Sequence, residues 1–266
     1  MKRVYALFSF TFLFCSLMGG LAAQTKKTKR PVSPPTAANE TPQPTPQPTV
    51  EISAKKNGRP TNPVNTNVNA PTSYSPAYFY EYTRPGFTYE RVLIEHDEAG
   101  KGRISFIKSG YSDMLTDPIQ LTSATMANLT AIFTALNFLG SNENYQTALD
   151  HSNMGNVSIT VKKEGRERTA KYNWTDNKQA KALMDEYRRI SNEYTWKFEM
   201  SVARENQPLL APALMDALSA YVRQSEISDP MHLVPTLKEL STDERLPLIA
   251  RDDAAKLIKQ IEKAKK

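Results

Sequence analysis

The chain has 266 residues, 39% of them hydrophobic, with a net charge of +6 and one cysteine, Cys15. A single cysteine excludes an intramolecular disulfide scaffold and a metal site built from several thiolates. A net positive charge would suit a nucleic-acid partner only if the basic residues lay in the folded part of the chain.

The N-terminal segment, residues 1–23, has the pattern of a secretory signal peptide. Two basic residues precede an apolar run from residue 4 to residue 17, and small residues follow. That order is typical of export signals, and the run is shorter than the about 20 residues of a membrane-spanning helix. We expect cleavage between Ala23 and Gln24 and export to the periplasm or the extracellular space, with no membrane span left after the signal is removed.

Residues 24–75 are predicted to form a disordered linker. The stretch 41–48 alternates proline with threonine and glutamine, and Asn, Thr and Pro continue to Pro71. Such a composition buries too little apolar surface to offset the entropy of ordering. The basic residues that follow the apolar run outnumber those before it, which favours an alternative, an uncleaved N-terminal membrane anchor.

Most of the positive charge lies in this linker. Residues 25–75 contain seven Lys and Arg against two Glu, whereas residues 76–266 contain 25 basic against 26 acidic residues. The folded part is therefore close to neutral, and we expect no nucleic-acid interface.

Alternating apolar residues predict two β-hairpins separated by a helix. We expect an α+β domain over residues 76–206, a small antiparallel sheet in the order β-β-α-β-β-α with helices on one face. The expected strands and their turns are residues 87–96 and 104–106 around a glycine-containing turn at 97–102, and residues 157–161 and 168–174 around Glu164 and Gly165.

Apolar residues at helical spacing predict a helix from residue 122 to 140 and a longer one from 176 to 205. In the longer helix, charges alternate in sign at four-residue steps from Lys181 to Lys197. Neighbouring side chains at that spacing pair with one another, so we expect a solvated, self-paired face.

The C-terminal segment, residues 207–266, is predicted to be a helical appendage of three shorter helices that begin near 212, 230 and 243. Its last two helices resemble one HEAT-type helix hairpin, a repeat that stacks into scaffolds for protein partners. The residues that carry this local resemblance are His232 to Leu240, Asp243, Arg251, Ala254, Ala255, Leu257, Ile258 and Ile261.

Few residues have a spacing that indicates catalysis. The three histidines, His96, His151 and His232, fall in separate predicted elements, so we expect no metal site. No cofactor-binding motif occurs. Asp150 and His151, in the loop from 140 to 155, are the nearest approach to an acid–base pair, although neighbours on an extended chain point apart. The length of this loop favours a binding role.

Aromatic residues are concentrated at the start of the folded region, and exposed rings with hydroxyl groups suit sugars or peptides. The other interpretation is that they form an edge strand packed against the helices. The candidate binding residues are Tyr78, Tyr80, Tyr82 and Phe87.

These observations favour an exported, non-catalytic module that binds a protein or polymer of the cell envelope through its aromatic cluster and C-terminal helices. The alternative is a hydrolase acting on envelope glycan or peptide material, with Asp150 and His151 in its site. A third hypothesis is a structural spacer, in which the linker matters more than the domain.

Overall fold

The computed structural model describes residues 74–264. The predicted signal peptide, the Ala23–Gln24 cleavage site and all of the predicted linker except its last two residues lie outside the described residues. Within residues 74–264, no helix is both long and apolar enough to cross a membrane.

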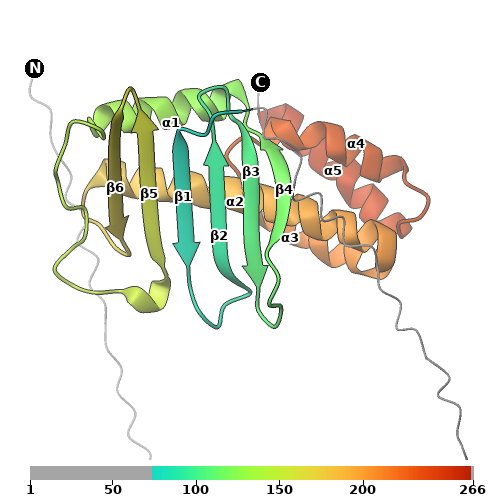
Figure 1. Ribbon diagram of the computed structural model, residues 1–266. Coiled ribbons are helices and arrows are strands. Elements are labelled where there is room, and N and C mark those ends of the chain that lie inside the picture. The colour runs from blue at the N-terminus through green and yellow to red at the C-terminus, as the bar shows by residue number, and fades with distance from the viewer. Residues whose placement is uncertain (1–73, 265–266) are drawn as a thin grey trace, which may run out of the picture. The chain divides into compact units, whose positions relative to one another are not determined.

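Six strands form one antiparallel sheet in the order β4-β3-β2-β1-β5-β6 (Figure 1). The predicted α+β class is confirmed, but the sheet has two strands more than the predicted order. The strands are β1 (Tyr78–Thr83), β2 (Tyr89–His96), β3 (Lys101–Lys108), β4 (Leu115–Gln120), β5 (Asn156–Lys163) and β6 (Arg166–Tyr172).

The additional strands are β1 and β4. β1 carries the aromatic cluster, and it pairs with both β2 and β5. The expectation that this segment forms an edge strand is therefore wrong, because β1 lies in the middle of the sheet. β4 is an edge strand that contains Pro118, a residue that interrupts strand patterns and is tolerated at sheet edges.

Five helices accompany the sheet within residues 74–264. The two helices predicted within the α+β domain are confirmed as α1 and α2, and short 3₁₀ turns precede β5, α3 and α4. The bounds are α1 (Ser123–Ala135), α2 (Lys178–Asn206), α3 (Ala211–Arg223), α4 (Val234–Thr242) and α5 (Leu248–Ala264), with η1 (Ser152–Met154), η2 (Pro208–Leu210) and η3 (Pro230–Leu233).

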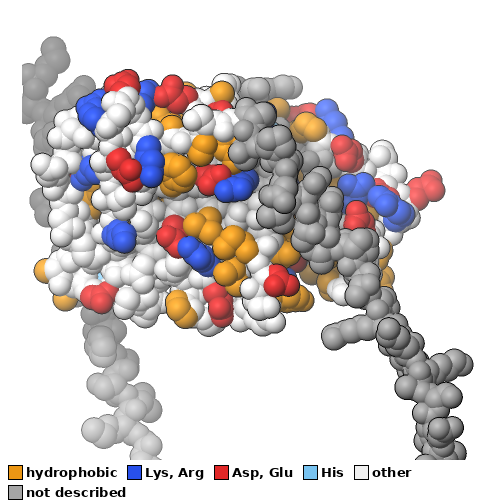
Figure 2. Space-filling view, in the orientation of Figure 1, with side chains coloured by type: hydrophobic (Ala, Val, Ile, Leu, Met, Phe, Trp, Pro, Cys, Tyr) orange, Lys and Arg blue, Asp and Glu red, His pale blue; other side chains and the backbone are white. Residues whose placement is uncertain are grey.

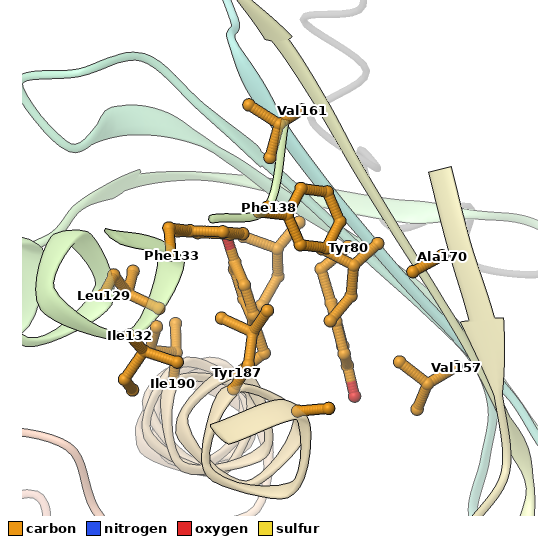
Figure 3. Packing of buried hydrophobic residues seen from close by; sticks show 14 of the residues in the cluster. Tyr80, Leu129, Ile132, Phe133, Phe138, Val157, Val161, Ala170, Tyr187 and Ile190 are labelled. Atoms are coloured by element: carbon orange, nitrogen blue, oxygen red, sulfur yellow. The ribbon is translucent and has the colours of Figure 1, made fainter. Parts of the chain in front are cut away.

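The first hydrophobic core lies between one face of the sheet and the helices α1 and α2. Tyr80 of β1 stacks on Tyr187 of α2 with ring centroids 4.8 Å apart (Figure 3). Leu129 of α1 and Ile190 of α2 are also buried in this core. Because strand side chains alternate between faces, the residues next to Tyr80 in β1, Phe79 and Glu81, belong to the opposite face, which we call the open face.

The second core is formed by the C-terminal helices and the last third of α2. Trp196 and Met200 of α2 are buried with Met215 of α3 and Leu237 of α4. The indole Nε1 of Trp196 donates a hydrogen bond to the carbonyl oxygen of Leu214 at 2.9 Å. This core thus begins before the predicted boundary at residue 206, since α2 contributes to both cores.

Buried carboxylates lie where α2 passes from one core to the other. Glu193 accepts hydrogen bonds from Lys197 Nζ at 2.7 Å and from the His232 ring at 2.6 Å. Lys181 and Asp185 pair on the surface as expected, at 2.7 Å. The prediction of a wholly solvated face is wrong at Glu193, which is 3% exposed, because the segment before α4 covers it.

His96, expected at the polar end of a strand, is fully buried in the first core. Its Nδ1 lies 2.8 Å from the Asp97 carbonyl oxygen, which only accepts, so Nδ1 carries the proton. Its Nε2 accepts from the Tyr187 hydroxyl at 3.0 Å. Burial lowers the pKa of His96 below its usual 6.5, so the folded protein holds a neutral imidazole.

This neutral histidine predicts a loss of stability in mild acid. Below about pH 6.5 the unfolded chain binds a proton at His96 that the folded state does not. The free energy of unfolding therefore decreases as the pH is lowered, by up to about 1.4 kcal/mol per pH unit. Urea unfolding at pH 7.5 and 5.5 should show this step in the wild type and a smaller step in His96→Gln. The half-exposed His151 provides the control: if His151→Gln reduces the step as much as His96→Gln does, His96 is not its source.

Candidate binding groove at the loop end of the sheet

The two ends of the sheet differ in their connections. At one end the strands are joined by short polar turns at residues 97–100 and 164–165. At the other end lie the loops 84–88, 109–114 and 141–155 and the segment that follows β6 (Figure 1). The strand register places these together, because Thr83 is opposite both Arg91 and Asn156. We call this second end the loop end.

Exposed apolar side chains gather at the loop end. The short turns at the opposite end contain no large apolar residue. Leu149 and Tyr111, at the loop end, are 69% and 65% exposed. Exposed apolar groups that recur at one end of a domain are typical of an interaction surface. The residues are Phe87, Tyr111, Met114, Leu149, Met154 and Trp174.

A groove of about 600 Å³ lies where the open face meets the loop 141–155, and its lining residues Asp150 and Asn173 are chain neighbours of the exposed Leu149 and Trp174. Its floor includes a row of cross-strand neighbours on the open face: Glu81 of β1, Ser158 of β5 and Lys171 of β6. Thr83 and Asn156 continue the floor toward the loop end. Its volume is within the range of ligand sites. On the visible part of this face, Figure 2 shows acidic and basic side chains next to one another, not a patch of one sign.

Asn173, directly after β6, holds the wall of the groove in place. Its Oδ1 accepts hydrogen bonds from Gln146 Nε2 and the His151 amide, both at 3.0 Å. Its Nδ2 donates to Asp150 Oδ1 at 2.6 Å and to Asn156 Oδ1 at 3.2 Å. One buried side chain therefore links the loop to the start of β5.

Arg168 of β6 anchors the beginning of the same loop. Its guanidinium donates to the carbonyl oxygens of Phe138 at 2.6 Å and Glu143 at 2.7 Å, and to the Tyr145 hydroxyl at 3.0 Å. It also lies over the Phe138 and Tyr145 rings, 4.7 and 4.9 Å from their centroids. The loop therefore borders the outer edge of β6, and its conformation is fixed by side-chain contacts where regular hydrogen bonding is absent.

The predicted acid–base candidates do not form a pair. Asp150 lines the groove, but its Oδ1 accepts from the Ser152 amide at 2.8 Å as well as from Asn173. The His151 ring lies against Trp174 instead, with ring centroids 5.3 Å apart. Asp150 thus acts as a loop-stabilising acceptor, and nothing positions His151 to exchange a proton with it.

The predicted aromatic binding residues are distributed over different environments. Tyr80 is part of the core, and burial raises its pKa. Tyr78 stacks on His96 on the helix side, and the Tyr82 hydroxyl donates to the Met154 carbonyl oxygen at 3.0 Å. Only Phe87, 47% exposed beneath the Arg84 guanidinium, presents much of its ring to solvent. The four residues do not form one exposed surface.

Sequence reasoning missed the residues that form the groove. Lys171 and Ser158 are single polar residues in ordinary strands, and Asn173 follows a strand like many turn residues. The loop 140–155 was a detectable signal, since its length without regular structure favours binding. The strands against which this loop lies are set by the pairing of β5 with β1 and β6, and the sequence of the loop does not indicate that pairing.

Within residues 74–264, no group of three or more histidine, cysteine or carboxylate side chains is arranged to hold a metal ion. A comparison of the whole chain with protein-family models finds no match. A comparison with curated protein sequences finds no match either.

The role of Asn173 predicts that its removal loosens the loop. In Asn173→Ala, Gln146 and the His151 amide lose their acceptor and Asp150 loses a donor, at a cost of about 1–3 kcal/mol in unfolding free energy. Hydrogen exchange read by mass spectrometry should show faster exchange over residues 146–155. Asn142→Ala, an exposed asparagine in the same loop, is the control, and equal exchange in both variants would contradict this role.

Proposed function

We propose that this chain is an exported, non-catalytic binding module of the cell envelope that contacts a protein or polymer through its loop end. The observation that carries the proposal is a groove at the loop end whose lining residues Asp150 and Asn173 are chain neighbours of the exposed Leu149 and Trp174. The polar groups of the groove offer hydrogen bonds that give specificity, and the burial of the nearby apolar side chains by a ligand favours binding.

The arrangement of Asp150 supports binding over hydrolysis. A general acid or base needs a carboxyl group free to exchange a proton with the substrate. Asp150 Oδ1 accepts two hydrogen bonds that hold the loop, and the neighbouring His151 ring packs against Trp174 and makes no hydrogen bond to this carboxylate. No serine in the groove hydrogen bonds to His151, so the described residues offer no activated nucleophile there.

We infer export and an envelope location from the sequence pattern of residues 1–23. From the composition of residues 24–75, we infer that the domain extends away from an attachment point. The C-terminal helices α3 to α5 are a second candidate contact surface. Their exposed residues Leu209 and Leu248, at the starts of α3 and α5, belong to the helical part of the chain and not to the groove.

Co-sedimentation of the purified protein with insoluble cell-wall polymer and with envelope membranes tests the proposal. Replacing Trp174 or Leu149 with Ser should reduce the bound fraction about fivefold or more, because exposed apolar anchors at binding surfaces dominate affinity. Val202→Ser, which changes a 38% exposed valine of α2 outside both the loop end and the C-terminal helices α3 to α5, is the matched control.

Three outcomes of that experiment would contradict the proposal. Absence of saturable binding to both materials would remove the binding function. Equal losses in the loop-end variants and in Val202→Ser would remove the assignment to the loop end. Release of soluble fragments from the envelope material by the wild type, abolished in Asp150→Ala, would establish the hydrolase alternative.

A further inference from the structure

We infer that the groove binds a carbohydrate segment that carries carboxylate groups, such as a chain of uronic acids. This inference rests on the proposed binding function and names the ligand class of the same site. Three observations carry it: hydroxyl and amide groups of the groove that have no partner within residues 74–264, an ammonium group that makes no ion pair there, and an exposed aromatic ring that directly follows the lining residue Asn173 in the chain.

The polar groups of the floor are suited to a ligand with many hydroxyls. Among residues 74–264, no side chain hydrogen bonds to the hydroxyls of Thr83 and Ser158, and the Nδ2 of Asn156 has no acceptor there. Hydroxyl groups both donate and accept, and an amide nitrogen donates twice. A sugar, whose hydroxyls also donate and accept, satisfies such a set better than an apolar ligand does.

Of the charged residues in the floor, Lys171 is the one without an oppositely charged partner within residues 74–264. Three other cations on the open face are paired with acidic residues: Arg91 with Glu81 at 2.8 Å, Arg103 with Glu95 at 2.8 Å, and Lys162 with Glu167 at 3.2 Å. Within residues 74–264, Lys171 makes no ion pair, and its cross-strand neighbour is the neutral Ser158.

A ligand carboxylate at Lys171 would complete the same pattern of pairing. Of the two acidic groups that line the groove, Glu81 is paired with Arg91, whereas Asp150 accepts hydrogen bonds from the neutral Asn173 and a backbone amide and belongs to the loop wall, not to the floor beside Lys171. A single ammonium group favours a carboxylate over a phosphate, because phosphate sites usually gather several donors such as Arg forks or backbone amides.

The exposed ring is Trp174, which directly follows Asn173 and is 39% exposed. Its contact with His151 fixes it beside the loop. A flat aromatic ring offers large contact area at low entropic cost and a face that the C–H groups of a sugar ring can cover.

An extended peptide fits the same place less well. Peptides that add to a sheet need an unpaired strand edge, and the edge of β6 is bordered by the loop that Arg168 ties down. The groove lies instead on the face of the sheet, where strand backbone groups already pair with one another.

Isothermal titration of the purified protein with a short oligogalacturonate, and with the same oligomer after reduction of its carboxyl groups, tests the inference. The wild type should bind the charged oligomer about tenfold more tightly than the reduced one, with an affinity that falls as salt rises. Lys171→Met should abolish that difference and leave binding of the reduced oligomer unchanged.

Lys162→Met, on the same face but paired with Glu167, is the matched control and should retain the preference. Thermal unfolding of each variant would show that the exposed substitutions leave the fold intact.

Equal affinity of the wild type for both oligomers, or a preference that survives Lys171→Met, would overturn the inference. Binding to envelope material without binding to either oligomer would overturn the ligand class and leave the proposed function standing. Failure to bind envelope material would remove that function itself.

Discussion

One helix, α2, is the element on which the rest of the structure depends. Tyr187 and Ile190 of α2 are buried against the sheet, and Trp196 and Met200 are buried among the C-terminal helices. Complete burial of such side chains contributes about 1.5–3 kcal/mol each. Because one continuous helix supplies both cores, neither core can be removed without exposing part of α2, and the described residues belong to one compact unit.

The position of α2 also leaves the other face of the sheet available. α1 and α2 cover the same face, so no helix within residues 74–264 covers the open face, which the loop 141–155 borders at the groove. Short turns close one end of the sheet, and longer loops gather at the other. Within residues 74–264, the open face and its loop end are therefore the parts of the sheet that no helix covers, and Lys171 and Trp174 lie there.

Local sequence patterns were sufficient for many elements. The turn at Glu164 and Gly165, the helices α1 and α2 and the strands β2 and β5 follow from periodicity and turn residues, which depend on near neighbours in the chain. The sequence predicted less where one residue type, here glycine, occurs both in turns and within strands. Gly100 has a positive φ and makes the expected turn. Gly102 instead lies in β3 opposite His96, where a Cβ would come 1.9 Å from the Glu95 carbonyl oxygen.

The sequence by itself determined the α+β class, the neutrality of the folded part and most element positions, because composition and periodicity record whether a segment can bury one face. Only the tertiary structure decided which aromatic rings are buried, that Glu193 and His232 meet, and that Lys171 makes no ion pair with another residue of 74–264. Those properties arise from contacts between segments far apart in the chain. β1, for example, lies between β2 and β5 in the sheet, although 59 residues (97–155) separate those two strands in the chain. The sequence pattern of any one segment does not indicate such neighbours.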